Sequence, residues 1–308
     1  MIDTAVLQVR VASEMELVTI TEAFNRGFSD YRYKAQFSPE QMRRFVRRGG
    51  IDLDASAVLV ALEGGHWRGA GVAFLAHAGR EGWCGGLAVA PEYRGQGGAR
   101  RLMQAIHDKA AAAAVDTMWL EVLRDNSRAQ RFYSSLGYAY TRTLQLWEAP
   151  AAQPTSAPAG YCLEQVAVGA VLDPLFAWQR ERTAWQRRRR AAELAYSDLW
   201  GYRLQAEDGS VAGYALCLPL PPQQPGEPRV RLMAIGVRPG AGSDEASALI
   251  AALRAQLDGA VLNLLNEPEN SLFVPALQAA GFAVQDEQYE MRLSLPGLPP
   301  GEVVQDGL

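Results

Sequence analysis

The chain has 308 residues, of which 48% are hydrophobic and 21% are charged, and its formal net charge is −4 at pH 7. This length accommodates one large or two ordinary domains, and the composition is typical of a globular protein and not of a disordered one. The small net charge gives no broad electrostatic reason to expect nucleic acid or an anionic membrane as a partner.

Cysteine and histidine are not arranged as in a metal site or a disulfide framework. The 3 cysteines lie far apart without a C-x-x-C pair, and the 3 histidines have no H-E-x-x-H spacing. The first residues lack a basic region followed by an apolar core, and no apolar run approaches about 18 residues. We therefore expect no metal, no membrane segment and a cytoplasmic location.

The first half of the chain alternates between strand and helix signals. Residues 6–11 alternate as a strand, and Ser13 with Glu16 has the pattern of a capping box, which predicts a helix through Phe24. A second helix is predicted from Ala99 by its apolar spacing. The other predicted strands of this half are 57–62, 69–78, 83–89, 117–122 and 138–147.

A short helix is predicted between the last two of these strands, capped by Asp125 or Asn126 and ending at Gly137. Residues 149–160 are rich in proline and small residues, which predicts an extended linker. We therefore expect a first domain over 1–148, the linker over 149–160, a second domain over 161–296 and a tail over 297–308.

The second half repeats the order of the first. A strand at 161–168 precedes Asp173-Pro174, which is predicted to cap a long helix carrying the arginine-rich run 180–190. We expect that run to be a solvated basic face with core tryptophans, not a nucleic-acid site. Later elements are a hairpin (201–206 and 211–218), a strand (229–237), a helix, a strand (260–265) and a helix ending at Gly281. The repeated order indicates a duplicated fold.

Glycines gather where the helix from Ala99 begins. Gly95, Gly97 and Gly98 allow a ligand to approach the backbone closely, and the amides at a helix N-terminus favour an anion. With Arg94 beside them, these amides could hold a pyrophosphate. The stretch is neither a Walker A loop nor a Rossmann fingerprint, because Gly98 is followed by Ala99-Arg100.

Two segments carry a resemblance to a known family. The stretch R-G-Q-G-G-A at 94–99 resembles the Q/R-x-x-G-x-G/A signature of the GNAT N-acetyltransferases, and 120–138 resembles their Asn-x-x-A-x-x-F-Y-x-x-x-G-Y segment. The resemblance is strong over 81–147. It implies two tandem α/β (α+β) domains, each a mixed, mostly antiparallel twisted sheet with helices on both faces. It also implies acetyl-CoA as cosubstrate and transfer to a primary amine by direct attack in a ternary complex.

The resemblance also implies site residues. Tyr133 would protonate the departing thiolate, although its spacing also suits a core position, and Glu81 is a candidate general base or else a solvated strand-end carboxylate. Main-chain amides of Leu87 and Val89 would bind pantetheine and the acetyl carbonyl. The cofactor contacts implied are Leu87, Ala88, Val89, Arg94, Gly95, Gln96, Gly97, Gly98, Ala99, Arg100 and Asn126.

The family builds part of its acceptor site after the first helix. Phe28, Tyr31 and Tyr33 could line that site and Asp30 could hold a cationic amine, or the aromatics could pack under the sheet. The acceptor would be a small-molecule amine or a peptide. The rival expectations are a longer acyl-CoA as donor, a thiol or hydroxyl as acceptor, or an acyl-CoA-binding sensor without turnover.

The second half departs from the family pattern at its key positions. Alignment of the two halves puts Gly242 opposite Arg94, and Asp244-Glu245 opposite Gln96-Gly97. Carboxylates would repel a pyrophosphate. We expect a degenerate second domain that is structural or shapes the substrate site, in a monomer that is a pseudo-dimer of two domains, or in a homodimer.

Overall fold

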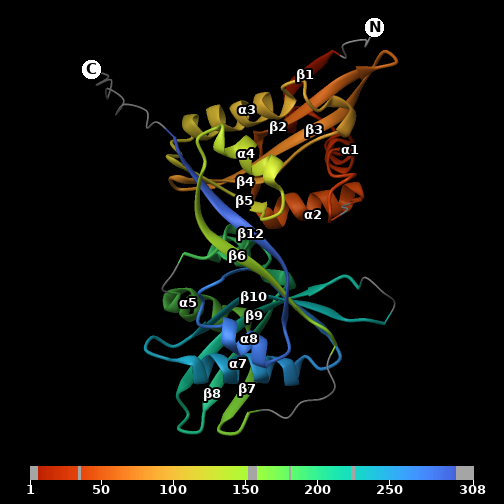
Figure 1. Ribbon diagram of the computed structural model, residues 1–308. Coiled ribbons are helices and arrows are strands. Elements are labelled where there is room, and N and C mark those ends of the chain that lie inside the picture. The colour runs from red at the N-terminus through yellow and green to blue at the C-terminus, as the bar shows by residue number, and fades with distance from the viewer. Residues whose placement is uncertain (1–5, 34–35, 152–157, 180–181, 223–225, 296–308) are drawn as a thin grey trace, which may run out of the picture. The chain divides into compact units, whose positions relative to one another are not determined.

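The computed structural model describes residues 6–33, 36–151, 158–179, 182–222 and 226–295 (Figure 1). These residues form two compact units. Unit 1 comprises Met1–Leu120, Tyr133–Ala139 and Met291–Leu308, and unit 2 comprises Glu121–Phe132 and Tyr140–Glu290. No helix among the described residues is long and apolar enough to cross a membrane.

The first half of the chain contains most elements of unit 1, together with part of β5, most of α4 and the strand β6 of unit 2. The strands are β1 (Leu7–Val11), β2 (Ile51–Glu63), β3 (His66–Ala78), β4 (Glu81–Val89), β5 (Thr117–Leu123) and β6 (Ala139–Ala149). The helices are η1 (Ala12–Glu14), α1 (Leu17–Gly27), α2 (Pro39–Gly49), η2 (Pro91–Tyr93), α3 (Gly98–Ala112) and α4 (Ser127–Ser134).

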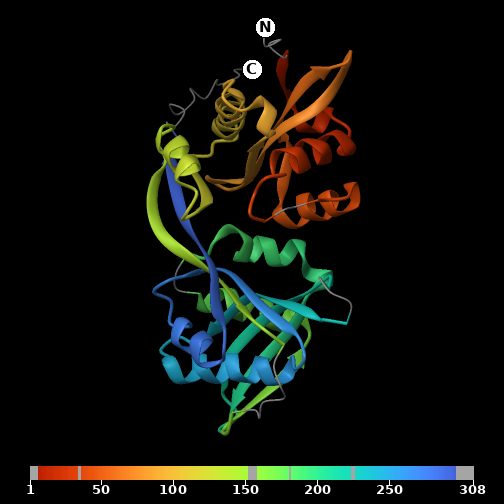
Figure 2. The same cartoon turned by 45° about the vertical axis from the view of Figure 1, so that its right-hand side comes forward.

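The sheet of unit 1 is mostly antiparallel, as expected. Strands β1 to β4 pair antiparallel in chain order, and β4 pairs with β5 in parallel. Val58 and Val60 of β2 pack with α1 and α2, whereas Leu59 contacts the start of α3. Successive strand residues point to opposite faces, so the helices cover both faces of this sheet (Figure 2).

The start of the first helix differs from the prediction. Residues 12–14 form a 3-10 turn, α1 begins at Leu17, and its N-cap Glu16 receives no side-chain cap from Ser13. The predicted capping box is therefore wrong, because Ser13 lies within the 3-10 turn and Glu16 itself takes the N-cap position of α1. Helix α2 was not predicted, although Ser38 caps it in a true capping box with Gln41 and Pro39 occupies its first turn.

The last strand, β12 (Ala283–Ser294), is shared between the units. Its final residues lie beside β5, where the Leu295 amide donates to the Asp116 carbonyl at 2.8 Å and Leu293 packs against the position of Gly137. Unit 1 is therefore completed by a segment from the C-terminal half of the chain. The sequence-based division places this segment in the second domain, since a strand pattern does not reveal which neighbour the strand will pair with.

The second half of the chain contains the other elements. The strands are β7 (Tyr161–Val166), β8 (Trp200–Ala206), β9 (Val211–Leu220), β10 (Arg229–Val237) and β11 (Val261–Pro268). The helices are α5 (Val168–Trp178), η3 (Trp185–Arg187), α6 (Arg189–Leu194), η4 (Tyr196–Asp198), α7 (Ser243–Gln256) and α8 (Val274–Ala279).

Unit 2 has the same topology. Strands β7 to β10 pair antiparallel, β10 pairs with β11 in parallel, and β6 adds antiparallel to β11. Residues 158–160 at the end of the expected linker are described, but 152–157 lie outside the described residues, as does the expected tail at 297–308. Each unit thus repeats one strand and helix order, as the sequence predicted.

The predicted long helix of the second half is wrong. Pro174 lies inside α5 and does not cap it, and the helix ends at Trp178. The arginine-rich run instead crosses η3 and enters α6. Trp185 is buried, as expected of a core tryptophan.

Candidate functional site

Strands β4 and β5 are paired at one end only. The parallel ladder joins Glu81–Trp83 to Thr117–Trp119 and then ends, while β4 continues to Val89 along β3. The Ala90 amide donates to β3, and amides alternate in direction along an antiparallel strand. The amides of Leu87 and Val89 therefore point away from β3, toward the side where the ladder has ended.

Because of this alternation, the amides of Leu87 and Val89 point in one direction and the amide of Ala88 points in the opposite one. The amides of Leu87 and Val89 have the direction that their predicted role requires. The Ala88 amide points toward β3, and Ala88 packs instead against Gly27 of α1. Strand β4 also has a bulge that leaves Gly85 without a partner in the register between Cys84 and Gly86.

The loop before α3 has the backbone conformation that its glycines permit. Gly95 and Gly97 have φ values of 79° and 77°, and a Cβ atom at either would meet nothing within 4 Å. These two glycines are needed for the left-handed backbone and face open space. Glycine is required at position 98 for a different reason: a Cβ there would lie 2.7 Å from the Leu59 side chain, which is too close.

The N-terminus of α3 is suited to an anion. Gly97 is its N-cap, with no side-chain cap, and its first turn contains no acidic residue. Amides at a helix N-terminus lack intrahelical acceptors and carry partial positive charge. The exposed loop and the uncapped helix together fit a pyrophosphate, which brings hydrogen-bond acceptors and negative charge.

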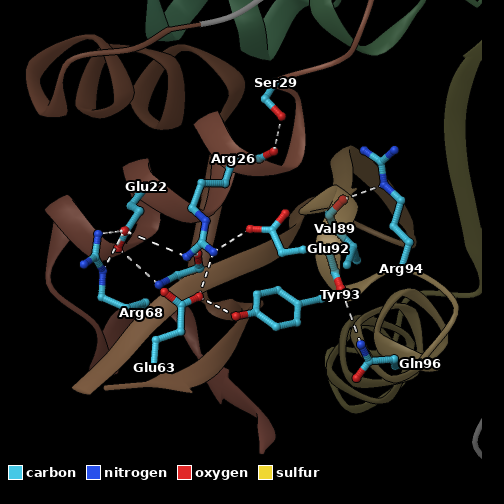
Figure 3. Close-up of polar contacts among 11 residues, drawn as sticks. Glu22, Arg26, Ser29, Glu63, Arg68, Val89, Glu92, Tyr93, Arg94 and Gln96 are labelled. Carbon is cyan, nitrogen blue, oxygen red and sulfur yellow. Dashed lines mark hydrogen bonds and ion pairs between the residues drawn. The ribbon is translucent and has the colours of Figure 1, made fainter. Parts of the chain in front are cut away.

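The polar side chains of this loop make contacts within unit 1. Arg94 donates to the Val89 carbonyl at 2.8 Å, as Figure 3 shows, and to both carboxylate oxygens of Asp30 at 2.7 Å. Arg100 donates to the Ser135 hydroxyl at 3.0 Å. The Gln96 side chain is exposed at 3.5 Å from the Glu92 carbonyl. The Arg94 charge is therefore paired, and the main-chain amides are the groups offered to an anion.

Tyr133 is buried on α4, with 7% of its surface exposed. Its ring meets Tyr138 edge-on at 5.9 Å, and the Tyr138 hydroxyl lies 2.9 Å from Nε2 of His107. Burial raises the pKa of Tyr133 well above its usual range, so that its hydroxyl stays protonated at neutral pH. Burial lowers the pKa of His107, which favours its neutral form. Tyr133 is thus both a core residue and a protonated donor.

Glu81 lies at the paired end of β4 and β5. Its carboxylate accepts a hydrogen bond of 2.7 Å from the Trp119 indole. Six residues separate it from Leu87, which is about 20 Å along a strand. Its role as general base stays a prediction.

The predicted acceptor residues follow α1. The Phe28 ring reaches within 3.9 Å of a Cβ placed on Gly86, and it packs against Tyr31 at 5.4 Å. Tyr31 in turn lies 6.5 Å from Tyr33. The structure therefore brings Phe28 to the bulged part of β4 and packs Tyr31 against it, whereas Tyr33 is exposed and Asp30 accepts from Arg94.

Asn126 belongs to unit 2 and has a local role there. Its side chain accepts from the Ala129 amide at 3.1 Å, which confirms it as a cap of the short helix α4. The predicted contact of Asn126 with the cofactor stays a prediction.

A group of ion pairs beside the loop was not predicted. Arg26 of α1 donates to Glu63 at 2.7 Å and to Glu92 at 2.6 Å, and Glu63 also accepts from the Tyr93 hydroxyl (Figure 3). Arg68 pairs with Glu22 in the same group. These residues come from α1, the end of β2, the start of β3 and η2, so no local spacing in the sequence could have revealed them.

Unit 2 repeats the strand geometry of unit 1 but not its uncapped helix N-terminus. The β10–β11 ladder also ends early, after Arg231 and Asn263. Glu245 accepts from the Gly242 amide at 3.1 Å and caps α7. The 3-10 helix η3 contacts both β10 and β11, and its Arg187 forms a buried ion pair with Glu267 of β11. A carboxylate of the chain thus already occupies the anion position of unit 2.

Comparisons with known proteins agree with this geometry. Residues 18–138 match the acetyltransferase (GNAT) family. A segment of 52 residues is 40% identical to a ribosomal protein bS18-alanine N-acetyltransferase of Haemophilus ducreyi. This match covers 17% of the chain and 36% of that relative.

Solved structures match nearly the whole chain. A GCN5-related N-acetyltransferase from Sphaerobacter thermophilus is similar with a TM-score of 0.66 at 17% identity, over 96% of this chain and 98% of that chain. A tandem GNAT protein from the clavulanic acid biosynthesis pathway is similar with a TM-score of 0.65 at 15% identity, over 94% and 98%. At these identities the likeness concerns the fold, and it confirms the predicted fold class.

Proposed function

We propose that unit 1 transfers an acetyl group from acetyl-CoA to a primary amine, because residues 18–138 match the acetyltransferase (GNAT) family. The observation that carries the proposal is the contrast between the two helix N-termini. That of α3 follows Gly95 and Gly97 and has no side-chain cap, whereas that of α7 is capped by Glu245. Amides at 95–100 of unit 1 would hold the pyrophosphate of CoA.

The chain supplies three groups for transfer by direct attack in a ternary complex. Acetyl-CoA brings the acetyl group as a thioester. The amides of Leu87 and Val89 orient and polarise its carbonyl, which makes the carbon more electrophilic. Phe28 and Tyr31 hold the acceptor amine near the bulge of β4. The neutral amine nitrogen forms the N–C bond, the C–S bond breaks, and the Tyr133 hydroxyl donates its proton to the sulfur. The nitrogen then loses a proton to solvent, and Tyr133 regains one from solvent.

Unit 2 has a structural or substrate-shaping role in this proposal. Two features oppose CoA binding there: the Glu245 carboxylate at the α7 amides, and η3 against both diverging strands. A pyrophosphate would have to displace Glu245 and overcome its charge.

We propose a peptide α-amine as the first acceptor to test. The relative from Haemophilus ducreyi carries the name of an enzyme acting on an alanine of ribosomal protein bS18. A peptide that begins with alanine therefore tests this acceptor class, and glucosamine and free amino acids test small amines.

The experiment follows thiol release from acetyl-CoA over this panel. Release that requires one acceptor and is lost in Tyr133→Phe supports the proposal. CoA binding without release for any amine indicates an acyl-CoA sensor instead. Faster release from a longer acyl-CoA than from acetyl-CoA indicates a different donor.

A further inference from the structure

Arg94 uses its guanidinium to join three parts of unit 1. Nε donates to the Val89 carbonyl at 2.8 Å, and Nη2 donates to the Gly27 carbonyl at 3.2 Å. Nη1 and Nη2 donate to the two carboxylate oxygens of Asp30, each at 2.7 Å. The partners are the last residue of β4, the last residue of α1 and a residue of the segment that follows α1.

Of these contacts of Arg94, only the one with Asp30 joins two charged groups. Paired guanidinium and carboxylate groups form short, charge-assisted hydrogen bonds with fixed geometry. Arg94 is the more buried partner, since 28% of its side chain is exposed compared with 55% of the Asp30 side chain. The pair therefore fixes orientation more than it adds stability.

The segment tied down by Asp30 carries the aromatic residues proposed for the acceptor. A Cβ on Gly27 would lie 2.6 Å from that of Ala88, so the end of α1 already touches β4. Phe28 follows directly and reaches Gly86. The position of Phe28 and Tyr31 on β4 thus depends on how the chain turns at Asp30.

A second link runs from the same loop to α1. Glu92 and Tyr93, directly before Arg94, bond to Arg26 and Glu63, and Arg26 also bonds to Glu63 (Figure 3). Consecutive residues 92–94 are therefore all bonded toward α1 or its neighbours. A ligand that fixes the backbone after Arg94 would therefore also lower the mobility of residues 92–94 and of their bonds to Arg26 and Glu63.

We propose that Arg94 and Asp30 are positioning residues that couple occupancy of the amide loop 95–100 to the order of the acceptor segment 28–33. The proposal rests on the proposed CoA site. Binding of CoA lowers the mobility of the loop, and the clamp passes this restriction to Phe28 and Tyr31. By reciprocity, an ordered acceptor segment strengthens CoA binding by the same factor.

Hydrogen exchange of the full chain, with and without saturating free CoA, tests this coupling. In the wild type we expect CoA to slow exchange severalfold in peptides covering 94–101 and also in those covering 27–33. In Asp30→Asn we expect CoA to slow exchange at 94–101 only. Asp30→Glu, which can still pair with Arg94, should restore part of the protection at 27–33.

The control is Glu40→Gln, which removes an exposed ion pair with Arg44 on α2 and should leave both effects unchanged. Protection at 94–101 without protection at 27–33 in the wild type would overturn the coupling and leave the CoA site intact. Protection at neither segment would overturn the CoA site itself. Unchanged protection at 27–33 in Asp30→Asn, with a raised KM for the acceptor, would make Asp30 an amine-binding residue instead of a clamp.

Discussion

At the scale of single residues, Tyr133 has an observed core position and a proposed chemical role. Its burial keeps the hydroxyl protonated, because the raised pKa leaves almost no tyrosinate at neutral pH. The sequence could place Tyr133 on a helix face but could not tell packing from catalysis, since the spacing is the same for both.

Tyr133→Phe separates the two roles. Phenylalanine keeps the ring and its packing on Tyr138 but removes the proton, so we expect kcat to fall by roughly 10²–10⁴-fold with CoA affinity unchanged. Steady-state kinetics of thiol release and a CoA titration measure the two quantities. Tyr140→Phe, at an exposed tyrosine, is the control. An unchanged kcat would leave Tyr133 as a core residue only.

Glu63 illustrates a residue whose importance no sequence pattern shows. Hydrogen bonds from Tyr93 and Arg26 lower the pKa of Glu63 below its ordinary value of 4.5. A carboxylate with a lowered folded-state pKa contributes stability that is present above the unfolded pKa and is lost as pH falls through the folded pKa. The contribution of this group of ion pairs is therefore confined to pH values above that range.

Glu63→Gln should lower the free energy of unfolding by about 1 kcal/mol at neutral pH. The difference from the wild type should shrink as the pH falls from neutral to an acid pH below the lowered pKa of Glu63, because Glu63 is then protonated in the wild type as well. Urea titrations followed by circular dichroism at both pH values check this. A difference that stays constant or grows at the acid end contradicts the assignment.

At the scale of elements, the sequence predicted best where one local signal decides the structure. The apolar spacing from Ala99 and the preceding glycines predicted α3 and its loop, and strand β10 was predicted at its observed bounds. Helix α5 was mispredicted because Pro174 is tolerated inside it. The direction of the Leu87 amide and the contacts of Arg26 depend on neighbouring strands and helices, and local patterns do not contain them.

Strand β12 gives a prediction at this scale. A chain that ends at Glu290 lacks the residues beside β5, including Leu293 and the Leu295 amide that bonds to Asp116. We expect this truncation to lower the thermal midpoint and to speed hydrogen exchange in β5, whereas a chain that ends at Leu295 should behave like the full chain. Equal midpoints for the two truncated chains would show that unit 1 does not need this strand.

At the scale of the whole molecule, the chain contains one fold twice and uses the two copies differently. Both units keep the parallel strand pair that ends early and the helix that follows. The copies differ at the helix N-terminus: Gly97 and Gly242 are the two N-caps, and the third helical residue is Arg100 in α3 but the acidic Glu245 in α7. The sequence alignment of the halves already indicated this difference, and the structure adds the capping bond of Glu245.

Calorimetric titration of the full chain with CoA, comparing the wild type with Gly97→Asp, tests the central claim most directly. The substitution places a carboxylate at the N-cap of α3, beside the amides proposed to hold the pyrophosphate, and aspartate is among the residues that tolerate the left-handed conformation. Gly209→Asp, at a glycine with a φ of 78° in a hairpin turn of unit 2, is the matched control. We predict one CoA per chain for the wild type and for Gly209→Asp, and no detectable binding for Gly97→Asp. Two CoA molecules per chain, or undiminished binding to Gly97→Asp, would contradict the account.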